Sequence, residues 1–261
     1  MIAAFRANLK KSFNRKGRKV RRESVPVLAS ELPLPTDFHF PFCYLAFMST
    51  RPGICGVILA AGESTRMGSD KALLAWPPAS SGVASAGQTF LSAAIEALGA
   101  FTDMVIVVAG KNESALASVV FANAAFLIRN PKPERGQFSS LQVGLQEVLN
   151  HGRDAALVTL VDRPPASTAT MQTLCDEFPT PASDIWAVIP EYGGRHGHPV
   201  LLVREMIEVF LKAPSTSNAQ EIEHQHQQHI SYIPVEDRFV TQNVDTPQDY
   251  AALSFPAPQT R

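Results

Sequence analysis

The sequence predicts an α/β protein: one domain with a mostly parallel β-sheet between two layers of helices, a three-layer α/β/α arrangement. Three observations support this prediction. From residue 54 onward, short apolar runs alternate with segments in which apolar residues recur at helical spacing. The runs are continuously apolar, which is typical of strands covered on both faces. No internal repeat and no linker interrupts the pattern after residue 54, so a single domain is expected.

The predicted strands are short apolar runs that end at turn residues. The first, residues 54–60, ends at Ala61-Gly62, where the chain must turn. The second, residues 103–109 (DMVIVVA), is rich in the β-branched side chains that favour strands. Five further strands are predicted at residues 125–129, 155–161, 185–190, 199–203 and 230–235.

The predicted helices carry their apolar residues on one side. Residues 139–149 place three leucines and a valine on a single face. Ser167 stands where its hydroxyl group can cap a helix over residues 167–178. Four other helices are predicted at residues 88–98, 113–122, 204–212 and 246–253.

Charge is distributed unevenly along the chain. Residues 1–22 hold nine of the 23 basic residues and no acidic one, so the remainder holds 14 basic against 24 acidic residues, a net charge of −10. An acidic body is poorly suited to a nucleic-acid backbone, and we expect no nucleic-acid partner. No apolar run approaches the roughly 20 residues that span a bilayer, and we expect no membrane segment.

Residues 1–50 show neither helical nor strand periodicity. Three interpretations remain open: a disordered tail, an Arg-rich transit peptide without acidic residues in its basic stretch, or a stretch upstream of a natural start at Met48. We favour the first and the third. We therefore predict a basic and Pro-rich extension over residues 1–50, disordered or not native, and a folded domain over residues 51–255.

The cysteines and a histidine-rich segment favour no metal site. Cys43, Cys55 and Cys175 are widely spaced, which fits neither a disulfide framework nor a zinc site and suggests a reducing, cytoplasmic location. Cys55 lies inside the first predicted strand and is expected in the core. In residues 223–229 (EHQHQQH), the three histidines do not share one helix face, and we interpret the segment as a solvated polar helix.

A polar run follows the first predicted strand, at the sheet edge where ligands of open α/β sheets bind. Residues 59–74 read LAAGESTRMGSDKALL. The small residues let backbone N–H groups approach a phosphate, and Arg66 and Lys71 supply the positive charge that a triphosphate requires. The run is not a Walker A loop, and a Gly-containing turn alone is a weak indication of nucleotide binding.

The full run resembles the signature loop of the MobA-like nucleotidyltransferases, L-A-(A/G)-G-x-S-x-R-M-G-x-x-K-x-L-L. Further motifs of that family follow in order: NP at residues 130–131, GQFSSLQVGL at 136–145, VDRP at 161–164, GHPV at 197–200 and NVDTP at 243–247. The resemblance covers residues 54–253 and is greatest to the molybdenum cofactor cytidylyltransferase branch. It implies a Rossmann-like nucleotidyltransferase fold.

The resemblance also implies a role for each motif. Arg66, Lys71 and Asp162 are the expected catalytic residues, and Asp162 and Asp245 are the expected ligands of Mg²⁺. The residues expected to bind the nucleotide or the acceptor are Leu59, Ala60, Ala61, Gly62, Ser139, Ser140 and His198.

Each of these residues also has a structural interpretation. Asp162 is suited to cap the turn that follows it, and Asp245 to cap a helix that starts near Thr246. Ser139 and Ser140 also fit a plain helix N-terminus, whose free N–H groups attract anions.

Two features concern the acceptor. Residues 193–199 (GGRHGHP) suit recognition of an anionic acceptor better than packing, although an ordinary flexible connection is also compatible with them. Arg163 departs from the cytidylyltransferase pattern, in which Gln often follows the metal-binding Asp. It suggests either a contact with an acceptor phosphate or a branch with a different acceptor.

The implied reaction transfers CMP from CTP to molybdopterin, and forms molybdopterin cytosine dinucleotide and pyrophosphate. The implied partners are CTP or another NTP, a molybdopterin-type acceptor and a molybdenum hydroxylase apo-enzyme. Three alternatives remain: a nucleotidyltransferase acting on a sugar- or polyol-phosphate, a guanylyltransferase of the same fold, and a non-catalytic carrier of a pterin dinucleotide.

A protein that begins at Met48 is expected to fold and to keep full activity, because periodicity begins only at residue 54 and the basic stretch ends at Arg22. Thermal melting and turnover of the shortened protein against the full chain test this. A large fall in either quantity would show that the preceding residues belong to the working protein.

Overall fold

The structure is a computed structural model that describes residues 53–81, 87–180 and 183–253. The extension predicted over residues 1–50 and Cys43 lie outside the described residues. Within the described part, no helix is both long enough and apolar enough to cross a membrane.

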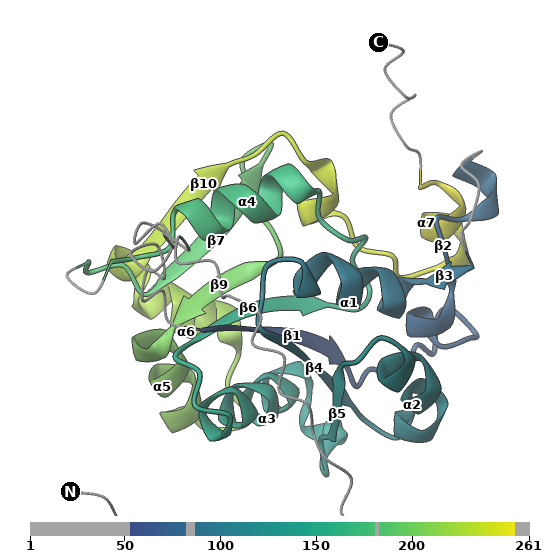
Figure 1. Cartoon of the computed structure of the whole chain (residues 1–261), viewed down its shortest axis with the longest axis horizontal. Coiled ribbons are helices and arrows are strands. Elements are labelled where there is room, and N and C mark those ends of the chain that lie inside the picture. Colours follow the sequence, from purple (N-terminus) through teal and green to yellow (C-terminus); the bar gives the residue numbers. More distant parts are fainter. Residues whose placement is uncertain (1–52, 82–86, 181–182, 254–261) are drawn as a thin grey trace, which may run out of the picture. The chain divides into compact units, whose positions relative to one another are not determined.

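A central sheet forms the middle layer of the domain (Figure 1). Its strands are β1 (Ile54–Ala60), β4 (Met104–Ala109), β5 (Phe126–Arg129), β6 (Ala155–Leu160), β7 (Ala187–Tyr192), β8 (Arg195–His196), β9 (Val200–Val203) and β10 (Ile230–Pro234).

The sheet is mixed but mostly parallel. The strand order is β10-β7-β9-β6-β1-β4-β5, and β8 pairs with β7 outside this path. β1 is parallel to both of its neighbours, β4 and β6, so the carboxyl ends of these three strands meet at one edge of the sheet. β9 runs antiparallel between β6 and β7. This arrangement confirms the predicted fold class.

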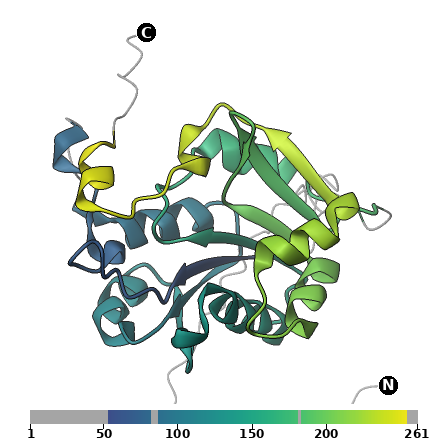
Figure 2. The same ribbon diagram turned by 180° about the vertical axis from the view of Figure 1, so that it is seen from behind.

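Helices cover both faces of the sheet, as the two opposite views show (Figures 1 and 2). One face is covered by α1 (Phe90–Gly99), α2 (Glu113–Ala122) and α4 (Thr168–Asp176). The other face is covered by α3 (Gln137–Asn150), α5 (Arg204–Lys212) and α6 (Ala219–Gln225).

Short elements complete the fold at the edges. They are the hairpin β2 (Ala75–Trp76) and β3 (Gln88–Thr89), the helix α7 (Pro247–Ala251), and the 3₁₀ turns η1 (Lys71–Leu73), η2 (Ala79–Ser81), η3 (Pro133–Arg135), η4 (Gln227–His229) and η5 (Arg238–Thr241).

Alternate side chains of β1 enter two separate cores. Ile58 and Ala60 pack with α1, α2 and α4, whereas Cys55, Val57 and Leu59 pack with α3, α5 and α6. A strand covered on both faces must be apolar throughout, which explains the continuous run in the sequence. Cys55 is fully buried, as expected, and burial raises the pKa of its thiol to about 12.

A third, smaller cluster joins the end of the chain to the region after β1. Its buried members are Met67, Phe90, Val244 and Leu253. The phenol of Tyr250 in α7 also donates a hydrogen bond to the carbonyl of Ala75, 2.8 Å away. We call the four buried residues Met67, Phe90, Val244 and Leu253 the C-terminal cluster. It holds residues 244–253 beside η1 although they are far from it in sequence.

Most predicted elements have the expected positions, and the exceptions have physical causes. β1, α2 and α5 begin and end at the predicted residues, and Ser167 caps α4 by accepting a hydrogen bond from the N–H of Thr170. The helix predicted at residue 88 begins two residues later, because Gln88 and Thr89 pair with β2.

The interpretation of residues 223–229 as one solvated helix is wrong. α6 ends at Gln225, and the ring of His229 stacks on Trp186 with 3.7 Å between centroids. His229 belongs to the separate 3₁₀ turn η4, and stacking on the indole covers one face of its ring, so the segment is neither one helix nor fully solvated.

α3 packs unusually close to the sheet at Gly144. A Cβ atom at this position would lie 2.8 Å from Val57 Cγ1 and 3.0 Å from Val108 Cγ2. Gly144 therefore sets the distance between α3 and the strands β1 and β4, and with it the position of the helix N-terminus.

Gly144→Val is expected to lower the free energy of unfolding by about 1–3 kcal/mol, the usual cost of overpacking a core. Chemical denaturation measures this. Gln146→Val is the control for a β-branched side chain at an exposed position of the same helix. Helix propensity rises from Gly to Val and falls from Gln to Val, so a loss at Gly144 is due to packing. An unchanged free energy of unfolding in Gly144→Val would contradict the close approach of α3 to the sheet.

Candidate active site

The loop between β1 and η1 is fixed at both ends by one side chain. Asn112, which follows β4, donates hydrogen bonds from Nδ2 to the carbonyl of Ala60 at 3.0 Å and to Asp70 Oδ2 at 2.7 Å. Gly110 approaches the loop so closely that a Cβ atom there would lie 2.6 Å from the carbonyl oxygen of Ala61. The neighbouring strand thus determines where this loop runs.

The loop delivers Lys71 to the edge of the sheet. The Lys71 N–H donates to the hydroxyl of Ser64 at 3.1 Å, and Asp70 caps η1 by accepting from the N–H of Ala72 at 3.0 Å. Ser64 adopts a positive φ of 50°, which is uncommon for a residue with a side chain. These contacts define the backbone at Lys71, whose side chain is almost completely buried.

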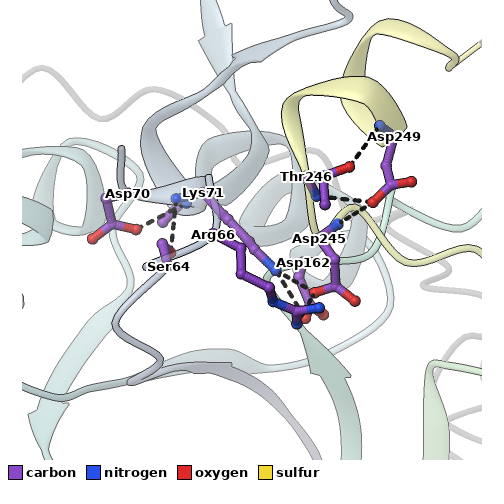
Figure 3. A network of polar contacts seen from close by, with 9 residues as sticks. Ser64, Arg66, Asp70, Lys71, Asp162, Asp245, Thr246 and Asp249 are labelled. Atoms are coloured by element: carbon purple, nitrogen blue, oxygen red, sulfur yellow. Dashed lines mark hydrogen bonds and ion pairs between the residues drawn. The ribbon is translucent and has the colours of Figure 1, made fainter. Parts of the chain in front are cut away.

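Lys71 lies between two carboxylates (Figure 3). Its Nζ is 2.6 Å from Asp245 Oδ1 and 3.6 Å from Asp162 Oδ2. Arg66 Nη2 lies 3.1 Å from the same Asp245 oxygen, with its side chain largely exposed. The structure therefore brings together the three residues expected to be catalytic and both residues expected to bind metal.

Asp245 reaches this position through backbone contacts. The N–H of Val244 donates to the carbonyl of Asp162 at 2.8 Å. Thr246, not Asp245, is the N-cap of α7, and it forms a capping box with Asp249. The interpretation of Asp245 as a helix cap is therefore wrong, and its carboxylate is left to face Lys71 and Arg66.

The carboxylate of Asp162 lacks part of its expected solvation. Its Oδ1 atom is buried and has no hydrogen-bond partner among the described residues. Burial raises the pKa of Asp162, and the positive charges of Lys71 and Arg163 oppose that rise. Ser167 caps α4, and the interpretation of Asp162 as a cap of the turn that directly follows it stays a prediction.

Asp162 and Asp245 fit a hard divalent cation. Both approach Lys71 Nζ, so the two carboxylates face a common point, and the unpaired oxygen of Asp162 is available there. In the part of the chain that the structure describes, no group of three or more His, Cys, Asp or Glu side chains could hold a metal alone. The donor set suits Mg²⁺, which normally keeps waters and substrate phosphate oxygens as further ligands.

A cleft of about 380 Å³ opens beside Lys71. One wall comes from the end of β1 and the loop after it, and the other from the N-terminal turn of α3. The lining residues on which the argument depends are Leu59, Ala61, Gly62, Lys71, Gly136, Gln137, Ser140 and Asp162.

Two residues expected to bind the nucleotide lie outside this cleft. The side chain of Ala60 points into the core beneath α1 and α2, because alternate residues of a strand face opposite sides. Ser139 is buried, and its hydroxyl donates to the carbonyl of Gly136 at 2.7 Å and accepts from Asn130 at 2.9 Å. For these two side chains, the expectation of direct contact with the nucleotide is corrected.

A second, larger cavity of about 700 Å³ lies next to the cleft, and Leu59, Gly136, Gln137 and Leu160 line both. Its basic lining residues are Arg135, Arg163 and Arg195. The two spaces therefore share a wall at the ends of β1 and β6, and the larger one is suited to an anionic ligand.

Arg163 is held in this cavity with part of its guanidinium unpaired. Nη1 donates to the carbonyl of Val240 at 2.9 Å, whereas Nε is buried without a partner among the described residues. Burial lowers the pKa of Arg163, the carboxylate of Asp162 opposes this, and Arg195 lowers it further. Two positively charged guanidinium groups that line one cavity are a suitable anion site.

His198 lines the larger cavity, not the cleft beside Lys71. Burial lowers the pKa of His198 to about 3, with the positive charge of Arg163 as a further cause. The ring is therefore neutral at pH 7, with Nδ1 3.4 Å from the carbonyl of Val158. His198 adds no positive charge to the cavity, so attraction of an anion depends on the arginines.

Two residues of this region were missed from the sequence. Asn112 could have been noticed, because it stands two residues after Gly110 at the carboxyl end of a predicted strand. Glu223 lines the larger cavity from α6, and no sequence motif marks it.

Comparison with known proteins agrees with this geometry. The MobA-like NTP transferase domain matches residues 56–230 of the chain. A curated relative, the probable molybdenum cofactor guanylyltransferase of Rhodopirellula baltica, is 32% identical over 123 residues, which make up 47% of this chain and 54% of the relative. The match thus spans about half the length of that relative.

Solved structures share the fold. The crystal structure of Rv0371c from Mycobacterium tuberculosis H37Rv is 25% identical with a TM-score of 0.63, over 76% of this chain and 95% of that chain. A complex of Rv0371c with manganese gives a TM-score of 0.60 at 23% identity, over 76% of this chain and 96% of that chain. The MobA-like NTP transferase domain matches more than half of the residues of this chain, and the chain therefore belongs to the MobA-like NTP transferase family.

Proposed function

We propose that the protein is a Mg²⁺-dependent nucleotidyltransferase that transfers CMP from CTP to molybdopterin. The observation that carries this proposal is the group formed by Lys71, Asp162 and Asp245. Lys71 and Asp162 line a narrow cleft that shares a wall with a larger arginine-lined cavity. Two adjacent spaces of different chemistry suit a reaction that joins two substrates.

The narrow cleft is the proposed nucleotide site. The small residues Ala61 and Gly62 leave the backbone after β1 accessible, and a Cβ atom at Gly62 would meet nothing within 4 Å. Lys71 and Arg66 supply two positive charges at the end of the cleft where the carboxylates lie. A triphosphate requires both an open backbone and such fixed charge.

The larger cavity is the proposed acceptor site. The guanidinium groups of Arg163 and Arg195 are close enough to influence each other, and Arg163 is adjacent in sequence to Asp162. A phosphate of the acceptor held by these arginines would lie near the α-phosphate of a nucleotide held by Lys71. This geometry supports the interpretation of Arg163 as a phosphate ligand.

The chemistry needs no catalytic base. A phosphate monoester has a second pKa near ~6 and is largely ionised at neutral pH, so one of its oxygens can attack the α-phosphorus directly. The new bond joins that oxygen to the α-phosphorus, and the bond to the bridging oxygen of pyrophosphate breaks. Lys71 and Arg66 stabilise negative charge on the transferred and leaving groups. Asp162 and Asp245 would hold Mg²⁺, which supplies further neutralisation of phosphate charge.

The divalent cation and the acceptor are supported by relatives as well as by geometry. Rv0371c has been crystallised with manganese, and the curated relative is named a molybdenum cofactor guanylyltransferase. That name also favours a second candidate, transfer of GMP to the same acceptor. We retain CTP because of Ala61, where the guanylyl branch of the family typically has glycine.

The rival classes make different predictions. A sugar- or polyol-phosphate nucleotidyltransferase would release pyrophosphate with such acceptors and not with molybdopterin. A carrier of finished pterin dinucleotide would release none. The purified protein is incubated with Mg²⁺ and each of the four NTPs, with molybdopterin in one series and sugar- or polyol-phosphates in another. Release of pyrophosphate in the first series, in the second or in neither separates these functions, and an apo-enzyme of the molybdenum hydroxylase class tests the proposed partner.

Lys71→Ala and Asp162→Ala are each expected to lower kcat by at least about two orders of magnitude, because each removes a main electrostatic contact to the transition state. Steady-state turnover at saturating Mg²⁺ measures this. Lys212→Ala and Asp176→Ala are matched controls at exposed positions of α5 and α4. Near-normal kcat in either test variant would refute the role assigned to that residue.

CTP is expected to give a higher kcat/KM than GTP, and Ala61→Gly is expected to narrow the difference. The methyl group of Ala61 lines the cleft, and one methyl group in a pocket is worth about 1–3 kcal/mol of discrimination. The measurement is kcat/KM for both nucleotides with the same acceptor. Equal or better use of GTP by the wild type would assign the protein to guanylyl transfer, whereas a CTP preference unchanged by Ala61→Gly would place its cause elsewhere.

A further inference from the structure

A single carboxylate lies in the arginine-lined cavity. α6 is anchored by Ile222, which is buried in the core beneath α5, and the next residue, Glu223, lines the cavity. Among the described residues that line this space, Glu223 is the only acidic one. Within the described part of the chain its carboxylate accepts no hydrogen bond and forms no ion pair.

The fold gives this carboxylate no stabilising contact. Burial raises the pKa of Glu223 to about 7. A titratable group on a neighbouring element is Tyr232 of β10, whose pKa is raised by burial and by the Glu223 charge. The other charged or titratable groups that line the cavity are Arg135, Arg163, Arg195, His196 and His198. A partly desolvated carboxylate that remains unpaired costs free energy, so a purely structural role does not explain it.

The surroundings of Glu223 favour a flat ligand with hydrogen-bond donors. A carboxylate accepts hydrogen bonds only, and it can accept two parallel ones from adjacent N–H groups. Tyr232, beside Glu223, stacks on His196 with 3.8 Å between ring centroids and 14° between ring planes. His196 of this pair lines the cavity, so an aromatic ring borders the space that Glu223 also lines. The arginines suit the anionic part of the same ligand.

We propose that Glu223 is the specificity residue for the acceptor, and that it accepts hydrogen bonds from the ring N–H and the exocyclic amino group of a 2-amino-4-oxopyrimidine ring, the donor edge of a pterin. This inference rests on the proposed function, because it gives the acceptor cavity its occupant. The ring binds at Glu223, and the acceptor phosphate binds at Arg163 and Arg195.

The test compares two fluorescent ligands that differ at one group. 6-Hydroxymethylpterin phosphate carries the 2-amino group, and 6-hydroxymethyllumazine phosphate has an oxo group in its place. The full chain is expected to bind the pterin at least about tenfold more tightly, since a buried acceptor loses a partner with lumazine. Glu223→Gln is expected to abolish the preference. Glu221→Gln, at an exposed position of the same helix, is expected to keep it.

A pH series separates recognition from a structural role. Only the ionised carboxylate accepts both hydrogen bonds, so pterin affinity of the wild type is expected to rise between about pH 5.5 and 7.5. The ligand phosphate, with a second pKa near ~6, also ionises over this range. The affinity of Glu223→Gln is therefore expected to follow only that phosphate ionisation, and the wild type is expected to show a further rise from the Glu223 carboxylate. Folding raises the pKa of Glu223 to about 7, so ionisation of this side chain destabilises the folded state, and the loss is complete above that pKa. Glu223→Gln removes the ionisable group. It is therefore expected to melt at a higher temperature than the wild type at pH 8 and not at pH 5. A lower melting temperature at both pH values would overturn the inference.

The two proposals fail in different ways. If the wild type transfers a nucleotide to molybdopterin and Glu223→Gln does so with unchanged KM and an unchanged pterin preference, the role of Glu223 is refuted and the proposed function stands. If the wild type prefers the pterin through Glu223 but releases no pyrophosphate with any NTP, the binding inference stands and the transferase proposal fails. Equal binding of both ligands by the wild type refutes the inference directly.

Discussion

The contact between Lys71 and Asp245 is the interaction on which the site depends. It joins residues 174 positions apart at a distance of 2.6 Å, and Asp162 lies 3.6 Å from the same ammonium group. Ion pairs of this kind are weak evidence for stability, because desolvation of both partners offsets much of their attraction. Removing one partner, in contrast, leaves the other charge unpaired in a partly buried place. The arrangement is therefore better explained as a prepared charge distribution. On the proposed function, the lysine and the carboxylates would exchange these contacts for a bound triphosphate and a divalent cation.

The end of the chain is as important to this charge distribution as the loop after β1. The match to the family domain ends at residue 230, and Asp245 lies beyond it. Three contacts place Asp245 opposite Lys71. They are the hydrogen bond from Val244 to Asp162, the packing of the C-terminal cluster and the hydrogen bond from the phenol of Tyr250. The two carboxylates are thus held by separate parts of the fold, one at the end of a central strand and the other on the segment that returns to it. A small shift of that segment would separate them.

The sequence predicts the parts of this fold that depend on local patterns. Continuous apolar runs locate β1 because both of its faces are covered, and the ordered motifs identify Lys71, Asp162 and Asp245. Local patterns do not indicate which polar side chains form hydrogen bonds within the protein and which remain free to contact a ligand. The hydroxyl of Ser139 bonds to Gly136, Thr246 replaces Asp245 as a helix cap, and Asn112 acts between two strands that are neighbours only in space. The contacts of Ser139 and Thr246 each span three residues, and the motif alone does not show that they take precedence over a role in the site. The contact of Asn112 is tertiary, and residue spacing does not encode it.

Burial also divides the charged groups of the larger cavity into two classes. Burial lowers the pKa of His198 to about 3, so that its ring is neutral at pH 7, and raises the pKa of Glu223 to about 7, so that its charge changes near neutral pH. A guanidinium group does not lose its proton in a protein, so Arg163 stays positive although burial and Arg195 lower its pKa. The cavity therefore carries permanent positive charge at one place and a carboxylate with adjustable protonation at another. A ligand with an anionic group and a donor edge stabilises both, because it neutralises the arginines and favours the ionised form of Glu223. A simple anion satisfies only the arginines. For this reason the chemistry of the cavity favours a heterocyclic phosphate over a smaller acceptor.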